Sequence, residues 1–340
     1  AGMDLYQLTE NNILPYDQDR VGWLGALGWD GLLFDFKNGE YIGVLPQTPY
    51  STFRSREKGG IDQYDFNIAF NISDRVYLGL TIGAYDVDYT KSYYYSEDYG
   101  DKQNYNIGSM NRISGSGFDF KMGAIIRPFE DSPFNIWMHN NDTGKDELLN
   151  SYFDTYKELN NKDMNREFRL KTPWKYNVSL GYTVGQNLAI GAEYEYEDYS
   201  SVKFRYPEGD KMEFETNAAK MVMKGVNTFR IGAEYKVIPQ FAFRLGYNYS
   251  SSIFKNGAIK YLPYNSVNTD TDFANSKSLS NYTLGIGYRG TMIYADLAYK
   301  FSSYKEDFYP FYNEFNDRGI VTPNVTKITN TRSQVLFTLG

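Results

Sequence analysis

Three glutamates at alternate positions, Glu193, Glu195 and Glu197, are the first candidates for chemistry in this sequence. Paired carboxylates can serve as general acid and general base, as they do in hydrolases. A spacing of two residues is also what a β-strand produces, because successive side chains of a strand point to opposite faces. Charges on one face of a strand therefore explain the spacing without catalysis.

Basic residues lie on neighbouring candidate strands with the same phase as these glutamates. We expect them to form cross-strand ion pairs that fill and rigidify an enclosed polar space, because opposite charges on adjacent strands attract. A polar transport route along the same face is the alternative. The expected participants are Lys175, Glu193, Glu195, Arg230, Glu234 and Arg244.

Other arrangements for catalysis or metal binding are missing from the sequence. The chain has no cysteine, and His139 is its one histidine. An axial haem ligand would be one use for His139, but it has no second His or Cys near it in the sequence. No Gly-rich loop leads into a helix. We expect no enzymatic activity, no cofactor and no metal.

The elements that position the charges are strands, and the clearest pair covers residues 172–199. Apolar residues from Trp174 to Val184 alternate with polar or small ones, and the pattern repeats from Leu188 to Tyr196 after a short break. The apolar face ends in Tyr or Trp, and the other face mixes Gly, Ser and Thr with charges. This pattern is typical of a transmembrane β-barrel with lipid outside and a polar lumen inside, and an amphipathic soluble sheet is the alternative.

Composition agrees with a large barrel. The 340 residues include 33 Tyr, 23 Phe and 30 Gly, and 18% of them are aromatic. The mean hydropathy of −0.55 and the lack of an apolar run of about 18 residues exclude a helical membrane protein. A net charge of −7 argues against nucleic acid as a partner.

Turn residues divide the chain into strands and connections. We expect strands over residues 21–36 and 41–56, with tight turns at Asn38-Gly39 and at residues 57–60. From residue 64 onward, short connections alternate with long ones, which places the short turns in the periplasm and the long loops outside. The expected long loops are 91–114, 140–171, 201–225, 252–279 and 305–328.

This reading gives about thirteen strands in the chain. Because the first and last strands would both run toward the periplasm, an antiparallel barrel with its amino end inside needs one earlier strand. We expect fourteen strands in the intact barrel, and further residues beyond both ends of the sequence.

One stretch, residues 145–160, has helical spacing. Its apolar residues repeat every three to four positions, with charged residues on the other side. The sequence predicts a short helix here, within an outer loop. The apolar residues are Leu148, Leu149, Tyr152, Phe153, Tyr156 and Leu159.

Two hairpins, TPWKYNVSLGYTVGQNLAIGAEYEYEDYS and VNTFRIGAEYKVIPQFAFRLGYNYSSS, and the segment GGIDQYDFNIAF resemble the FadL-type outer-membrane transport family. The likeness covers most of residues 60–340 and is nearest to the Bacteroidetes branch often labelled hemin receptors. It implies one barrel domain over residues 1–340, fourteen strands and an amino-terminal hatch with an Asn-Pro-Ala element. No such element occurs here, so we expect the hatch and the first strand upstream of Ala1.

The resemblance also implies a function. Members of this family take up small hydrophobic molecules, long-chain fatty acids among them, through the Gram-negative outer membrane, and their third and fourth outer loops capture the ligand. Those loops correspond to residues 91–114 and 140–171. The candidate ligand-binding residues are Leu148, Leu149, Tyr152, Phe153, Tyr156, Tyr93, Tyr94 and Tyr95.

Each of these expectations has an alternative. The tyrosines could belong to an aromatic girdle or pack within loops, and the helix could be a lid over the barrel. The whole chain could be a non-transporting subunit with protein partners, like the FadL-like barrel of type IX secretion, or it could take up haem. Expected partners are outer-membrane lipid and a small hydrophobic ligand.

Overall fold

The fold comes from a computed structural model, which describes most of the chain. The described residues are 5–13, 21–43, 49–73, 76–100, 104–126, 134–142, 147–154, 163–260, 266, 268–310, 314–316, 319–321 and 324–340, with no side chains described from 126 to 166 or from 311 to 323. Within these ranges, no helix is long and apolar enough to cross a membrane.

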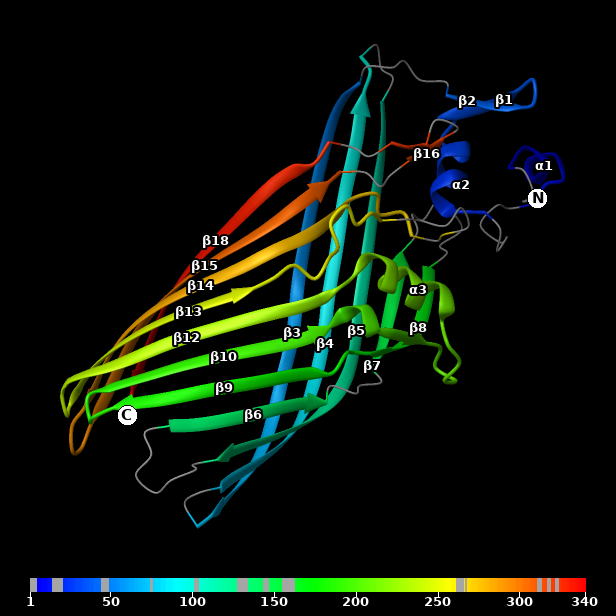
Figure 1. The fold of residues 1–340 in the computed structure, drawn as a ribbon. Coiled ribbons are helices and arrows are strands. Elements are labelled where there is room, and N and C mark those ends of the chain that lie inside the picture. The colour runs from blue at the N-terminus through cyan, green and yellow to red at the C-terminus, as the bar shows by residue number, and fades with distance from the viewer. Residues whose placement is uncertain are drawn as a thin grey trace.

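One large antiparallel sheet of fourteen strands dominates the molecule and curls into a barrel wall (Figure 1). Eleven of its strands follow one another around the wall in chain order. They are β3 (Tyr50–Ile72), β4 (Val76–Asp98), β5 (Asn104–Ile126), β6 (Phe134–Asp142), β9 (Lys175–Val184), β10 (Leu188–Asp198), β12 (Gly225–Ile238), β13 (Phe241–Ser250), β14 (Phe273–Arg289), β15 (Tyr294–Tyr309) and β18 (Thr326–Leu339). Over the described residues, the edge strands β3 and β18 do not pair with each other.

The other three strands of the sheet form a side branch. β5 pairs with β6 near its carboxyl end and with β7 (Glu147–Asp154) over residues 111–116. β7 pairs in turn with β8 (Asp163–Lys171), and β8 with β11 (Lys203–Arg205). Two small hairpins lie apart from the sheet. They are β1 (Phe34–Lys37) with β2 (Glu40–Gly43), and β16 (Glu314–Asn316) with β17 (Gly319–Val321).

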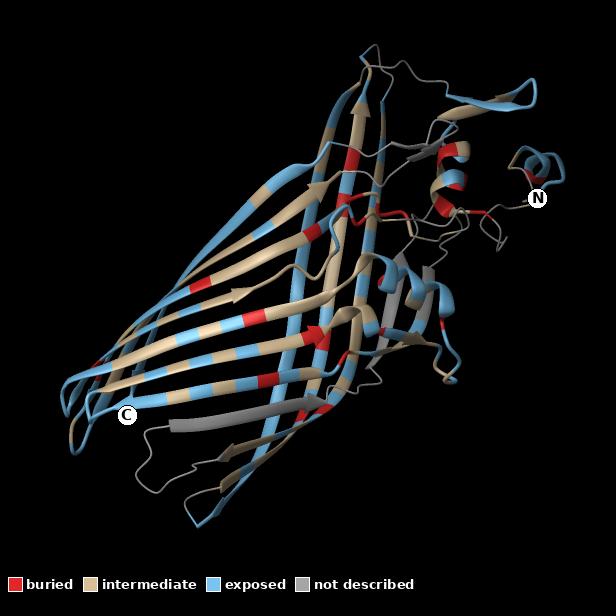
Figure 2. Ribbon diagram, viewed as in Figure 1, coloured by how far each residue is buried: buried red, intermediate tan, exposed pale blue. Residues whose placement is uncertain are grey.

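Alternation along the wall strands places apolar side chains on the outer face. Figure 2 shows that exposed and partly buried residues alternate along β9, β10 and β12. Large apolar residues such as Leu180, Ile231 and Leu245 are exposed on that face. A wall with an apolar exterior and charged residues on its inner face matches the solvent preferences of lipid outside and water inside.

Strands β3, β4 and β5 are longer than a membrane requires. Each has 23 residues, whereas a tilted strand crosses a bilayer in about 9–11. Their outer face is apolar up to the row Tyr64, Ala84 and Phe118, which are register partners. The next outward row is Asp62, Asp86 and Ser116, and the outer face stays mainly polar beyond it. The three strands therefore continue past the outer membrane boundary, for roughly 40 Å along β3.

The helices lie at the end of the barrel where β3, β4 and β5 extend beyond the membrane. This end is opposite the short hairpin turns and the carboxyl terminus (Figure 1). They are α1 (Leu5–Glu10), α2 (Trp23–Asp30), the 3-10 turn η3 (Tyr199–Ser201) and α3 (Glu213–Val222). Leu8 of α1 and Ala26 of α2 are fully buried and form a small core with Val21. This end, which carries the long connections, holds the candidate site.

The amino-terminal third departs from the prediction. The tight turn at Asn38-Gly39 is confirmed, with both residues at positive φ as a two-residue hairpin turn requires. The strand predicted over residues 21–36 is wrong, because α2 and β1 occupy it. The predicted turn at residues 57–60 is also wrong, because β3 runs through it with Gly59 at φ +110°. Among the described residues, the wall consequently has eleven strands where thirteen were predicted.

Two predicted outer loops are strands instead. β4 reaches Asp98 and β5 begins at Asn104, so little of the predicted 91–114 loop remains. The helix predicted over residues 145–160 is also wrong, because β7 covers residues 147–154. β5 outside the membrane offers unpaired backbone groups at residues 111–116, and β7 satisfies them, whereas an isolated short helix gains little in water. Residues 155–160, which include Tyr156, lie outside the described part.

Candidate functional site

An apolar cavity lies between α2 and the extramembrane ends of β4 and β5. Its volume is about 550 Å³, which is within the usual range for small-molecule sites. Leu24 and Leu27 of α2 form one side, and Tyr95, Tyr105 and Ile107 form the other. We call this space the mouth cavity. The complete lining is Leu24, Leu27, Gly28, Gly31, Leu33, Phe34, Tyr95, Glu97, Tyr105, Asn106, Ile107 and Thr271.

Local sequence explains how α2 presents its part of the cavity. Trp23 and Ala26 are buried, whereas Leu24 and Leu27, one position further on, line the cavity. The helix ends where the N–H of Gly31 donates to the carbonyl of Leu27 over 2.9 Å. Gly28 has no side chain, and a Cβ there would lie 2.7 Å from the Phe34 ring. The glycine thus lets Phe34 pack against the helix at the cavity wall.

One carboxylate stands among the apolar walls. Glu97 of β4 accepts hydrogen bonds from the hydroxyls of Tyr95 and Tyr99. The rings of Tyr95 and Tyr105 meet edge to face with centroids 6.3 Å apart. Burial, and then the hydrogen bond to Glu97, raise the pKa of Tyr95 to about 12, so its hydroxyl keeps its proton and donates.

A segment before β14, residues 268–272, forms part of the cavity floor through Thr271. It is fixed to the inner face of β4 and β5 at two places. The Tyr93 hydroxyl donates to the carbonyl of Thr269 over 2.6 Å, and the Thr269 hydroxyl donates to Ser109 over 3.0 Å. These contacts hold the segment across the barrel mouth.

Charges reinforce that attachment. Lys91 of β4 and Asp272 form an ion pair of 2.9 Å, and the Asp272 side chain is only 4% exposed. Lys260 donates to the backbone carbonyls of Asp270 and Asp272 over 2.6 and 3.3 Å. Burial lowers the pKa of Lys260 to about 8, against the opposing effect of Asp270, and burial also raises the pKa of Asp270. A buried pair that loses one partner leaves an uncompensated charge, so this cluster resists opening.

The inner wall carries the cross-strand ion pairs expected from the sequence. Lys175 lies 3.5 Å from Glu195 and 3.3 Å from Glu197. Arg230 contacts Glu193 and also reaches Glu195 over 3.1 Å. The chain of charges joins strands β9, β10 and β12.

A second group ties the next strands together. Arg244 of β13 lies 2.7 Å from Glu234 of β12 and 2.6 Å from Asp296 of β15. Gly287 of β14 lies between them, and a Cβ there would approach the Asp296 carboxylate to 2.5 Å. Arg244 therefore spans an intervening strand because that strand has glycine at the crossing.

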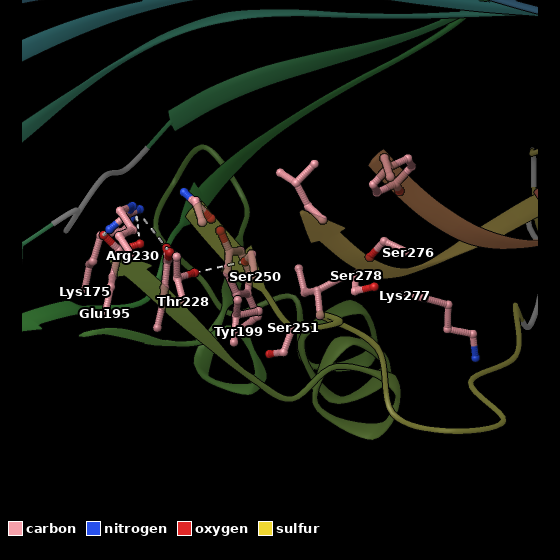
Figure 3. A pocket seen from close by; sticks show the side chains of 16 residues that line it. Lys175, Glu195, Tyr199, Thr228, Arg230, Ser250, Ser251, Ser276, Lys277 and Ser278 are labelled. Atoms are coloured by element: carbon pink, nitrogen blue, oxygen red, sulfur yellow. Dashed lines mark hydrogen bonds and ion pairs between the residues drawn. The ribbon is translucent and has the colours of Figure 1, made fainter. Parts of the chain in front are cut away.

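A polar pocket lies near the outer end of this wall and is shown in Figure 3. Its volume is about 340 Å³, and Lys175, Glu195 and Arg230 lie together on one side of it. Hydroxyl side chains line much of the remainder, including Thr228 and Ser250, whose oxygens are 2.9 Å apart. Because Ser276 and Ser278 of β14 also line it, the chain leads from the floor of the mouth cavity into this pocket within a few residues.

The structure separates the three predicted tyrosines. Tyr95 lines the mouth cavity, and Tyr93 is buried against segment 268–272. Tyr94 points to the opposite face and is 43% exposed. The other predicted ligand residues, Leu148, Leu149, Tyr152 and Phe153, lie on β7, where side chains are not described.

Sequence reasoning missed the α2 side of the cavity and Glu97. A signal for α2 was available, because Trp23, Leu24, Ala26 and Leu27 have helical spacing between Gly22 and Gly31. No sequence signal links Glu97 to α2, because folding brings together segments more than sixty residues apart.

Comparisons with known proteins support the fold. No protein-family model matches the chain, and no curated protein matches it. Among solved structures, a Pseudomonas aeruginosa FadL homologue is similar with a TM-score of 0.52 at 14% identity, over 83% of this chain and 67% of that one. The chain therefore has the fold of an outer-membrane β-barrel of the kind seen in Gram-negative bacteria.

Two further solved structures align with lower scores. The CymD monoaromatic hydrocarbon channel gives a TM-score of 0.39 at 10% identity, over 84% of this chain and 87% of that one. A TodX mutant, also a monoaromatic hydrocarbon channel, gives 0.37 at 9% identity, over 84% and 78%.

Proposed function

We propose that the protein is an outer-membrane channel for passive uptake of small hydrophobic molecules, with first capture in the mouth cavity. The observation that carries the proposal is the cavity itself, because it has apolar walls of Leu24, Leu27, Phe34 and Ile107 on the outer side of the membrane boundary. An apolar cavity outside the membrane binds apolar ligands because binding removes their apolar surface from water.

Segment 268–272 lies on the proposed route inward. Thr271 belongs to the cavity, and the chain that follows enters β14, whose Ser276 and Ser278 line the polar pocket. Movement of this segment away from Tyr93 would connect the two spaces. The fold shared with the FadL homologue agrees with a transport role, whereas the ligand is argued from the cavity alone.

Uptake of a labelled alkanol such as decanol tests the proposal in Gram-negative cells that produce the full-length protein, because lipopolysaccharide slows unaided entry. Leu27→Asp places a charge in the cavity and should reduce protein-dependent uptake about tenfold. Leu32→Asp is the matched control, because Leu32 is 77% exposed and lies outside the cavity lining. Both variants should keep the heat-resistant gel mobility of a folded barrel.

Equal uptake by Leu27→Asp and the wild type would contradict the proposal. A non-transporting subunit would then move ahead, and one observation favours it as the second candidate. The outer face of β3 beyond the membrane carries Arg54, Arg56 and Lys58 in one row, a surface suited to an acidic protein partner. His139, the haem ligand considered from the sequence, lies on β6, where side chains are not described, so haem uptake stays an untested alternative.

A further inference from the structure

Glu97 is the one charged residue in the lining of the mouth cavity, as far as the described residues show. Its carboxylate accepts from Tyr95 and Tyr99, which fix its position. Within the same described part of the chain, no lysine or arginine forms an ion pair with it. The cavity thus joins apolar walls to a single negative group.

Neighbouring charges do not offset Glu97. The charged cluster of segment 268–272, which adjoins the cavity residue Thr271, contains two cations, Lys91 and Lys260, and two anions, Asp270 and Asp272. Lys91 pairs with the Asp272 carboxylate, Lys260 donates to the backbone carbonyls of Asp270 and Asp272, and the four formal charges sum to zero. Among the residues that line the cavity, Glu97 supplies the charge, and the hydroxyls of Tyr95 and Tyr99 hold its carboxylate in place.

This arrangement distinguishes ligands by their head groups. A carboxylate beside Glu97 would place two like charges in a partly dehydrated space, where repulsion is stronger than in water. An amine or hydroxyl can instead donate to the Glu97 oxygens, and an ammonium also gains from the faces of the Tyr95 and Tyr105 rings. An apolar tail is accommodated equally in each case.

We propose that the mouth cavity selects small hydrophobic molecules whose head group donates a hydrogen bond, amines above all, and excludes carboxylates through Glu97. This inference rests on the proposed capture role of the cavity. It departs from the fatty-acid-like ligand that the sequence resemblance implies.

Three ligands with one tail test the inference, namely octylamine, octanol and octanoate. Their binding to the full chain in a non-ionic amphipol is measured by calorimetry, with titrations of protein-free amphipol subtracted. The wild type should bind octylamine at least about tenfold more tightly than octanoate. Glu97→Gln should tighten octanoate about tenfold and change octanol by less than about twofold. Asp98→Asn is the matched control, because Asp98 is exposed and outside the cavity lining, and it should leave all three affinities unchanged.

The outcomes separate this inference from the proposed function. If the wild type binds octanoate as tightly as octylamine, the head-group selection is wrong. It is also wrong if the ratio of octylamine affinity to octanoate affinity is the same in Glu97→Gln as in the wild type. If octanol still binds and Leu27→Asp weakens it, capture by the cavity stands and only the selection fails. If none of the three ligands responds to Leu27→Asp, the proposed function fails with it.

Discussion

The two halves of β4 show the same alternation but carry their apolar residues on opposite faces. From Val76 to Ala84 the outward positions are apolar and the inward ones are mixed, whereas from Asp86 onward the outward positions are mainly polar and the inward ones include Tyr93 and Tyr95, which are buried. The change occurs at the row Asp62, Asp86 and Ser116. The change along β4 therefore marks the position at which the outer face passes from lipid to water. Beyond that position the buried inner face is aromatic, and a binding site can form there.

The largest effect is expected at the attachment of segment 268–272, which exists only in the extramembrane half. Asp272→Asn removes one partner of a buried pair and should weaken docking of the segment by about 3–5 kcal/mol, because Lys91 is left buried and charged. Spin labels at Asn268 and Ser92 should then report a broadened distance distribution. An unchanged distribution would show that the pair does not hold the segment.

Arginine substitutions on the outer face of β5 compare the two halves directly. Met122→Arg lies in the apolar band and should cost about 2–4 kcal/mol near the bilayer midplane. Ser114→Arg lies beyond the boundary, opposite Asp88, and should change stability by less than about 0.5 kcal/mol. Folding titrations in lipid vesicles measure both. Equal costs would place the membrane boundary elsewhere.

Raising the pH should strengthen docking of segment 268–272. The buried, docked Lys260 has a pKa of about 8, and an exposed lysine has one of about 10.4, so the docked state binds fewer protons between these values. Docking therefore gains stability as pH rises through this window and keeps a constant penalty below it. Asp270 acts with the opposite sign in the acid range, because its pKa is raised.

The same spin-label pair measures this pH dependence, since the readout does not itself titrate. Distances between Asn268 and Ser92 should sharpen from pH 7.5 to 9.5 in the otherwise unaltered protein. Lys260→Met should abolish the change. Sharpening that persists in Lys260→Met would assign the effect to another group.

A small effect is expected for the ion pairs on the inner face of the wall. Glu195→Gln weakens contacts with Lys175 and Arg230 and should cost about 1 kcal/mol, because the lumen is partly solvated. Heat resistance of the folded barrel should fall slightly while uptake of decanol is retained. Loss of uptake with full heat resistance would mean that the charges belong to a transport route.

The membrane wall could be predicted from sequence because lipid imposes one rule on it. Every second residue from Leu188 to Tyr196 must suit lipid, and the alternation is legible without knowledge of the fold. The ion pairs of Glu193 and Arg230 follow from that register, since partners on adjacent strands share a phase.

The extramembrane half could not be predicted in the same way. Residues 91–114 have a polar composition that is typical of a loop. In the structure, the backbone pairing of β4 with β5 nevertheless continues through most of them. The pattern at residues 145–160 is helical in isolation, and β7 forms because β5 supplies an edge. The cavity needs α2 to lie against Tyr105 and Ile107, a contact that depends on distant segments and not on spacing.

A crystal structure with bromo-octane tests the central claim most directly, because the anomalous signal of bromine locates the ligand without assumptions. We expect a bromine peak within the mouth cavity, beside Leu27, Phe34 and Ile107, with Leu27→Asp removing it. Bromine found only against the outer apolar band, with the mouth cavity empty, would contradict capture at this site.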